Sequence, residues 1–124
     1  MLNAFEAATL YALHPTAART ATGQGSAVDI RDVEGDLAVT LDSAAGTGTT
    51  PTLDVKLQDS DDGSTGWADV SGATFTQVAG VAAQQKITVD TNAMKRYVRA
   101  AYTIGGTTPS FTFSVNGLGR KKTV

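Results

Sequence analysis

TLDVKLQDSDDGSTGWADV, residues 52–70, is the stretch that decides the fold. Leu53, Val55 and Leu57 alternate with polar residues, so the pattern predicts a strand with one apolar side and one side facing water. The run DSDDGS that follows, residues 59–64, has the Asp, Ser and Gly content of a chain reversal. WADV then predicts a second strand. The stretch is therefore expected to form a β-hairpin whose apolar side chains enter a core.

The same alternation of apolar and polar residues recurs through most of the chain. It predicts about eight short strands, over residues 27–31, 37–41, 52–58, 67–70, 73–78, 85–89, 95–104 and 111–115. This number and spacing are typical of a two-sheet sandwich or jelly roll, with a barrel as the main rival, and short connections favour antiparallel pairing. We expect an all-β fold, an antiparallel two-sheet β-sandwich resembling a jelly roll.

Two connections are rich in small residues. SAAGTGTTP, residues 43–51, is expected to be a flexible exposed loop, because it holds several Gly, Ala and Thr residues and ends in Pro. GGTTP, residues 105–109, is expected to be a tight link that returns the chain to the strand FTFSV.

The two ends of the chain differ from the middle, which divides the sequence into an N-terminal arm (residues 1–25), a β-sandwich domain (26–118) and a basic tail (119–124). Within the arm, alanines and a possible Asn cap predict a short helix over residues 3–13. Such a short helix needs a surface to pack on. The arm either lies on its own domain or frays, or it docks on a neighbouring subunit.

The chain has 124 residues, a net charge of −2 and 18% charged residues. One domain with one core is expected at this length, and the charge balance favours neither a nucleic-acid binder nor a disordered chain. No apolar run approaches the ~20 residues that span a bilayer, and the first residues are a poor match to a secretory signal. We therefore expect a protein made in the cytoplasm that binds neither nucleic acid nor membrane.

The acidic turn is the first candidate for chemistry. Asp59, Asp61 and Asp62 place carboxylates near Gly63, as calcium loops do. The spacing departs from that of an EF-hand, because Val70 stands where the bidentate glutamate belongs. We interpret the run as a solvated hairpin turn and expect no metal site.

Catalytic patterns are also missing from the sequence. His14 is the only histidine, and its place before Pro15 indicates an exposed arm residue. No serine lies in a GxSxG elbow, and GTGTT, residues 46–50, has no lysine and no following helix to hold a phosphate. The chain has no cysteine. We expect no enzymatic activity, no catalytic residue and no cofactor.

Two basic groups remain. Lys95, Arg96 and Arg99 fall on one predicted strand, where pairing with nearby Asp side chains is favoured over a nucleic-acid surface. The cations of the tail are either solvated or dock on an acidic neighbour.

Several motifs occur in order along residues 26–122. They are AVDIRDVEGDLAVTLD, LDVKLQDSDDGSTGWADV, TFTQV and KRYVRAAYTIGGTTPSFTFSVNGLGRKK. In these motifs the chain resembles a family of small structural proteins of tailed bacteriophages, mostly described as head-associated, decoration or cement-like proteins.

The resemblance implies a non-enzymatic virion protein, made in the host cytoplasm. It would be a capsid decoration, cement or head-spike base protein that binds the assembled head shell at the capsid surface. Its partners would be the major capsid protein and copies of itself in a homo-oligomer. We predict that contacts to other subunits or to the shell come from apolar residues of the arm and cations of the tail: Phe5, Leu10, Tyr11, Arg120, Lys121 and Lys122.

Two alternatives stay open. One is a structural component of the phage tail or baseplate. The other is a carbohydrate-binding β-sandwich module, in which Trp67, Tyr97 or Tyr102 would stack on sugar rings if exposed.

Overall fold

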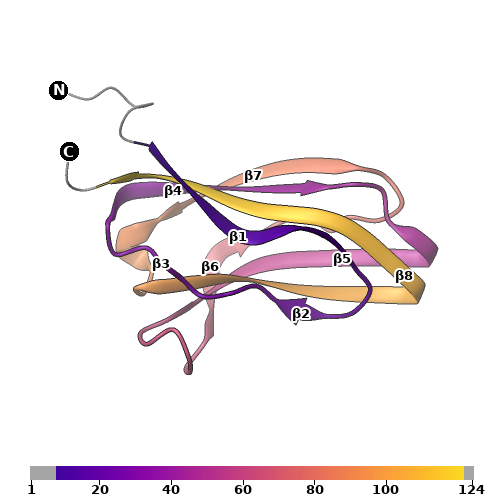
Figure 1. The fold of residues 1–124 in the computed structure, drawn as a ribbon, viewed down its shortest axis with the longest axis horizontal. Coiled ribbons are helices and arrows are strands. Elements are labelled where there is room, and N and C mark those ends of the chain that lie inside the picture. The colour runs from indigo at the N-terminus through magenta and orange to yellow at the C-terminus, as the bar shows by residue number, and fades with distance from the viewer. Residues whose placement is uncertain (1–7, 122–124) are drawn as a thin grey trace.

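The computed structural model of the chain describes residues 8–121, which form an all-β fold (Figure 1). The strands are β1 (Ala8–Arg19), β2 (Gly23–Gln24), β3 (Val28–Asp29), β4 (Val33–Ser43), β5 (Thr47–Ser60), β6 (Ala68–Thr74), β7 (Ala83–Asp90) and β8 (Tyr97–Lys121). A short 3₁₀ helix, η1 (Thr91–Ala93), lies between β7 and β8. Within residues 8–121, no helix is long and apolar enough to cross a membrane.

β8 pairs antiparallel with both β4 and β5, two strands that follow one another in the chain. The pairing runs from Val33 opposite Lys121 to Ser60 opposite Tyr97, along the whole of β8. This long ribbon folds over on itself at the right of Figure 1, so that its two halves lie in facing sheets.

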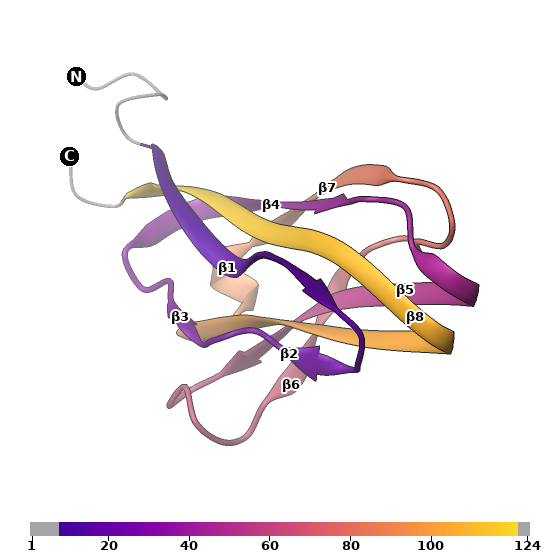
Figure 2. The same ribbon diagram turned by 45° about the vertical axis from the view of Figure 1, so that its right-hand side comes forward.

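The remaining strands extend the two halves of the ribbon sideways. One sheet, which we call the β4 sheet, has the order β1-β8-β4-β7. The other, the β5 sheet, has β2 and β3 beside β8, followed by β5 and β6. The predicted antiparallel two-sheet sandwich is confirmed, and β8 belongs to both sheets (Figure 2).

The core lies between the sheets, and the alternation in the sequence decides which side chains enter it. Leu53, Val55 and Leu57 of β5 are at most 1% exposed, as are Phe111 and Phe113 of β8. Burial of each such side chain contributes about 1.5–3 kcal/mol to folding. The core role predicted for these strands is confirmed.

The same tetrapeptide, Gly-Thr-Thr-Pro, stands at both places where the ribbon bends, in residues 48–51 of β5 and residues 106–109 of β8. Thr49 lies opposite Thr107, so the two motifs face each other across the ladder. The register shifts on either side of this pair, as is usual where paired strands bend sharply. We call these two segments the corner motifs.

The corner motifs share an unusual backbone conformation. Gly48 and Gly106 have φ angles of 103° and 110°, while Thr50 and Thr108 have φ angles of 48° and 47°. A Cβ at Gly48 would lie 2.5 Å from the carbonyl oxygen of Thr108, and one at Gly106 would lie 2.7 Å from that of Thr50. Positive φ at a β-branched residue costs on the order of 1–3 kcal/mol. The bend is therefore strained, and it excludes side chains at both glycines.

Two expected connections and one expected strand differ from the structure. Residues 43–51 are not a flexible loop over most of their length, because β8 supplies pairing partners from Thr47 onward. Residues 105–109 reverse the chain, but the segments they join lie in opposite sheets and do not form a hairpin. The strand expected over residues 73–78 is divided, since β6 ends at Thr74 and Val78 only bridges Leu53.

The first described residues form a strand where a helix was expected. The predicted helix over residues 3–13 is wrong for its described part, because β1 pairs with β8 from Ala8 opposite Arg120 to Arg19 opposite Phe111. Helix propensity is a weak preference, and here strand pairing and the burial of Leu13, 1% exposed, override it. The expected arm thus contributes β1 and β2 to the sandwich, and β8 extends into the expected tail.

We predict that Gly48→Ala and Gly106→Ala each lower the free energy of unfolding by about 2 kcal/mol or more, because a Cβ meets the backbone of the facing motif. The matched control is Gly35→Ala, which also has positive φ but no atom within 4 Å of the added Cβ. It should cost about 1 kcal/mol. Urea unfolding measures all three, and equal losses would show that the corners are not sterically closed.

Candidate interaction surfaces

Two neighbouring leucines are exposed on the outer face of the β4 sheet. Leu10 of β1 is 77% exposed and lies directly opposite Leu118 of β8, which is 43% exposed. Leu118 also lies opposite Ala38 of β4, so the row crosses three strands. Neighbouring exposed apolar side chains are more informative than scattered ones, since contact surfaces gather them. We call Leu10, Leu118 and Ala38 the leucine row.

A register shift in β1 explains why the strand places side chains both in the core and on the outer face. The register with β8 shifts between Ala12 and His14. As a result, Leu13 and His14 are both buried although they are consecutive. Before the shift, Tyr11 is half-buried and packs against the core, while Leu10 faces outward.

The predicted contact residues that are described gather at one end of the β4 sheet. Leu10 and Tyr11 pair with residues 118 and 117 of β8, next to Arg120 and Lys121. The Arg120 guanidinium lies 3.4 Å from the Glu34 carboxylate, and both side chains are exposed. Lys121 is opposite Val33, whereas Phe5 and Lys122 lie outside the described residues. The contact role of these residues stays a prediction.

The acidic turn is held by its own hydrogen bonds. The Asp62 carboxylate accepts from the backbone N–H groups of Ser64 (2.9 Å) and Thr65 (2.8 Å), and these bonds hold its pKa far below the usual range. Asp59 is buried and accepts from the backbone N–H of Lys95 at 3.1 Å. Within residues 8–121 no three His, Asp or Glu side chains gather as a metal site. The predicted turn is present, and its carboxylates fix the backbone.

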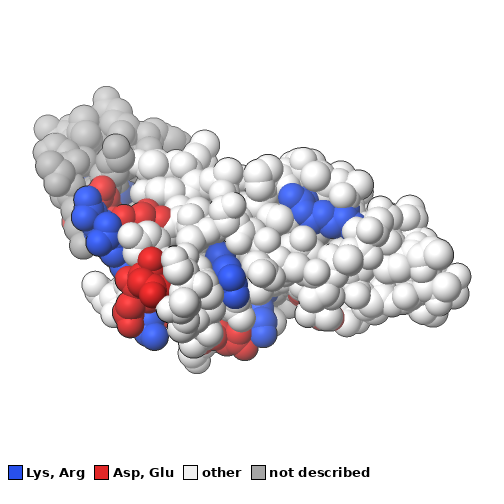
Figure 3. All heavy atoms as spheres, turned by 60° about the horizontal axis from the view of Figure 1, so that its bottom comes forward, with Lys and Arg blue, Asp and Glu red and all other residues white. Residues whose placement is uncertain are grey.

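Neighbouring side chains contact Lys95, Arg96 and Arg99. Figure 3 shows blue and red groups interspersed over the left part of the face that it presents. Arg96 pairs with Asp29 at 2.8 Å, which lowers the pKa of Asp29, and Lys95 lies 3.9 Å from Asp61. Arg99 instead donates to the Gln58 amide oxygen at 3.0 Å. The expected pairing with Asp is found for two of the three cations.

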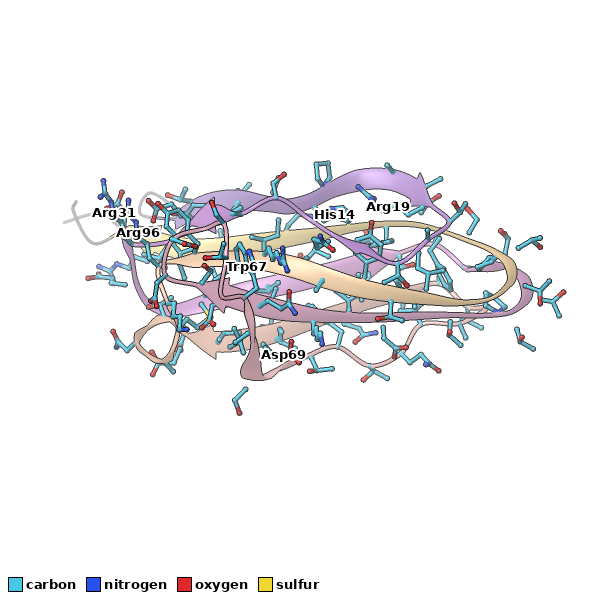
Figure 4. All side chains as sticks on the ribbon, turned by 90° about the horizontal axis from the view of Figure 1, so that it is seen from below. His14, Arg19, Arg31, Trp67, Asp69 and Arg96 are labelled. Atoms are coloured by element: carbon cyan, nitrogen blue, oxygen red, sulfur yellow. The ribbon has the colours of Figure 1, made fainter. Side chains whose placement is uncertain are left out.

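The aromatic residues considered for sugar binding all make internal contacts. The Arg99 guanidinium lies over the Trp67 ring at 4.3 Å from its centroid. Trp67, which is labelled in Figure 4, is half-buried. Arg96 lies 5.1 Å from the centroid of the Tyr97 ring. Tyr102 is 9% exposed and belongs to the core. An arginine therefore covers one face of the Trp67 ring and lies near the Tyr97 ring.

His14 was expected to be an exposed arm residue, and that prediction is wrong. It is 7% exposed, with ring centroids 4.9 Å from Tyr102 and 5.4 Å from Phe113. Its Nε2 has no hydrogen-bond partner among the described residues. Burial, and secondarily the nearby Arg19 cation, lower the pKa of His14. The sequence around His14 and Pro15 does not indicate this burial, because the burial depends on the register shift in β1.

The geometry defines a two-sheet β-sandwich with an exposed apolar row at one edge. No family model matches the sequence, and no curated protein matches it either. Among solved structures, the SPBc2 prophage-derived protein YomS is similar over 90% of this chain and 93% of its own, with 11% identity and a TM-score of 0.50.

Two structures of infectious bursal disease virus contain a region of similar fold. The VP2 subviral particle is similar over 90% of this chain, with 16% identity and a TM-score of 0.54, and the Gt strain structure over 91%, with 14% identity and a TM-score of 0.53. This chain spans 31% and 33% of those two chains. At such identities the likeness is one of fold.

We predict that stability falls as the pH is lowered from about 7.5 through 6.5 to 5. Burial holds the folded-state pKa of His14 below 6.5, so the unfolded chain binds more protons in this range. His14→Phe should remove this dependence, and should raise the free energy of unfolding at pH 7.5 by about 1 kcal/mol because the unpaired nitrogen is gone. Urea unfolding at several pH values tests both effects. Parallel pH profiles for the two proteins would show that His14 is not the titrating group.

Proposed function

We propose that this chain is a non-enzymatic structural protein of a phage virion that lies on the head shell as a decoration or cement protein. Its partners are the major capsid protein and further copies of itself, and it sits at the capsid surface. The observation that carries the proposal is the likeness in fold to a prophage-derived protein over nearly the full length of both chains. It agrees with the expectation drawn from the sequence motifs that resemble those of small tailed-phage proteins.

The distribution of polar groups also supports a binding role. The only histidine is enclosed by Tyr102 and Phe113, where a substrate has no access to it. The cations Lys95 and Arg96 form ion pairs with carboxylates of the protein's own surface. The leucine row adds two neighbouring exposed apolar side chains, Leu10 and Leu118, that a partner can cover. A protein that binds a repeating shell gains stability from many such modest contacts.

The structure changes which parts should be tested as shell contacts. Removal of the whole expected arm would delete β1 and with it Leu13 of the core. Removal of residues 1–7 leaves β1 whole, and neutralising Lys121 and Lys122 leaves the Arg120–Glu34 ion pair in place. These changes isolate the outermost predicted contacts from the fold.

We predict that the wild-type chain cosediments with purified phage heads, and that deletion of residues 1–7 combined with Lys121→Gln and Lys122→Gln weakens this binding at least about tenfold, or ~1.4 kcal/mol. Lys86→Gln, at an exposed position of β7, is the control and should bind normally. If the wild-type protein fails to bind heads and instead labels tails or baseplates in electron microscopy, it is a tail or baseplate component. Binding to neither would remove the virion proposal.

A further inference from the structure

One part of the β4 sheet has an open edge. Residues 8–12 of β1 pair with residues 116–120 of β8 on one side, and no other described strand pairs with them on the opposite side. Every second residue of an edge strand directs its N–H and C=O groups outward, where another strand can pair with them. An unpaired edge is therefore a template for strand addition unless something blocks it.

The other edges of the two sheets carry features that block strand addition. The second half of β1 contains Pro15 and a further register shift. β7 bears the exposed Lys86 at its centre, and β6 contains Gly72 with a φ of 75°. β2 and β3 are only 2 residues long each. Proline, charge, irregular backbone and short length are the usual protections of edges, and the run ATLYA, residues 8–12, has none of them.

The leucine row lies at this same unprotected edge. Leu10 is the central residue of the run and is 77% exposed, with Leu118 beside it on the sheet side. A strand added along the edge would cover the free flank of Leu10. The edge offers backbone hydrogen bonds, which give strand-addition interfaces their affinity, together with an exposed apolar side chain.

We propose that two copies of this chain pair through residues 8–12 of β1, antiparallel about a two-fold axis at Leu10. In this register Ala8 meets Ala12 of the second copy and Thr9 meets its Tyr11, so the paired side chains are uncharged and two of the pairs are small. Leu10 meets its own copy, so the two leucine rows join into one row across a continuous sheet of both subunits. An isologous contact of this kind closes on itself and yields a dimer.

The charges near the edge are compatible with this pairing. The run itself carries none, and the Arg120–Glu34 pair lies beside Ala8, whose partner position in the second copy is Ala12. Ala12 is next to Asn116 on β8, so no like charges face each other. Pro15 of each copy ends the ladder, because proline has no N–H to donate. The interface is therefore confined to one short run in each subunit.

The oligomeric state of the full chain tests the proposal. Sedimentation equilibrium should show a reversible dimer for the wild-type protein, and Leu10→Lys should raise the dimer dissociation constant at least about tenfold. Val81→Lys is the matched control, since Val81 is 78% exposed and lies outside every strand. Thermal unfolding followed by circular dichroism verifies that each variant is folded. A wild-type monomer at all concentrations, or equal weakening by both substitutions, would overturn the proposal.

The register gives a second test, which is possible because the chain has no cysteine. Leu10→Cys places the two new thiols opposite each other at the axis, and mild oxidation should convert it to a covalent dimer. Thr9→Cys and Val81→Cys should form covalent dimers at least about tenfold more slowly. Similar rates for all three would exclude pairing about Leu10. Neither test uses phage heads, so their outcome is independent of the proposed virion function.

Discussion

The antiparallel pairing of β8 with β4 and β5 is the interaction on which the rest of the structure depends. This pairing extends from one end of β8 to the other. Each remaining strand pairs with one of the two outer edges of the ribbon. β1, β2 and β3 attach to β8, β6 attaches to β5 and β7 attaches to β4. Because the ribbon folds over, its two halves become the central strands of opposite sheets. Loss of register in β8 would therefore disturb both sheets and the core between them.

Folding this ribbon over requires a bend that ordinary strands resist, and the corner motifs provide it. Glycine at positions 48 and 106 allows the two backbones to approach, while Thr50 and Thr108 adopt positive φ at a cost of roughly 1–3 kcal/mol each. The bend brings Leu53 and Phe111 into the interior, and each such burial returns about 1.5–3 kcal/mol. The fold tolerates this strain because only a few residues bear its energetic cost. The stabilisation from the buried side chains accumulates along both strands.

The sequence predicts the parts of this fold that depend on local alternation and misses those that depend on partners. Leu53, Val55 and Leu57 alternate with polar residues, so their strand and its buried side could be predicted. β1 could not, because its alanines favour a helix until the open side of β8 is available for pairing. Of the candidate contacts, Leu10 is exposed as expected, but nothing local indicates that Leu118 lies beside it. Pairing across more than one hundred residues of sequence has no signature in either segment.

The surface of the described residues has charged parts and uncharged parts, and this distribution affects how the protein can associate. Arg96 and Lys95 lie beside Asp29 and Asp61, so opposite charges alternate on that part of the surface. The corner motifs carry no charge, and neither does the run of residues 8–12. Salt at physiological strength largely screens exposed charges that are more than about 8 Å apart, but it has little effect on strand pairing or leucine contacts. Association through the edge of β1 would thus be governed by backbone geometry and apolar burial.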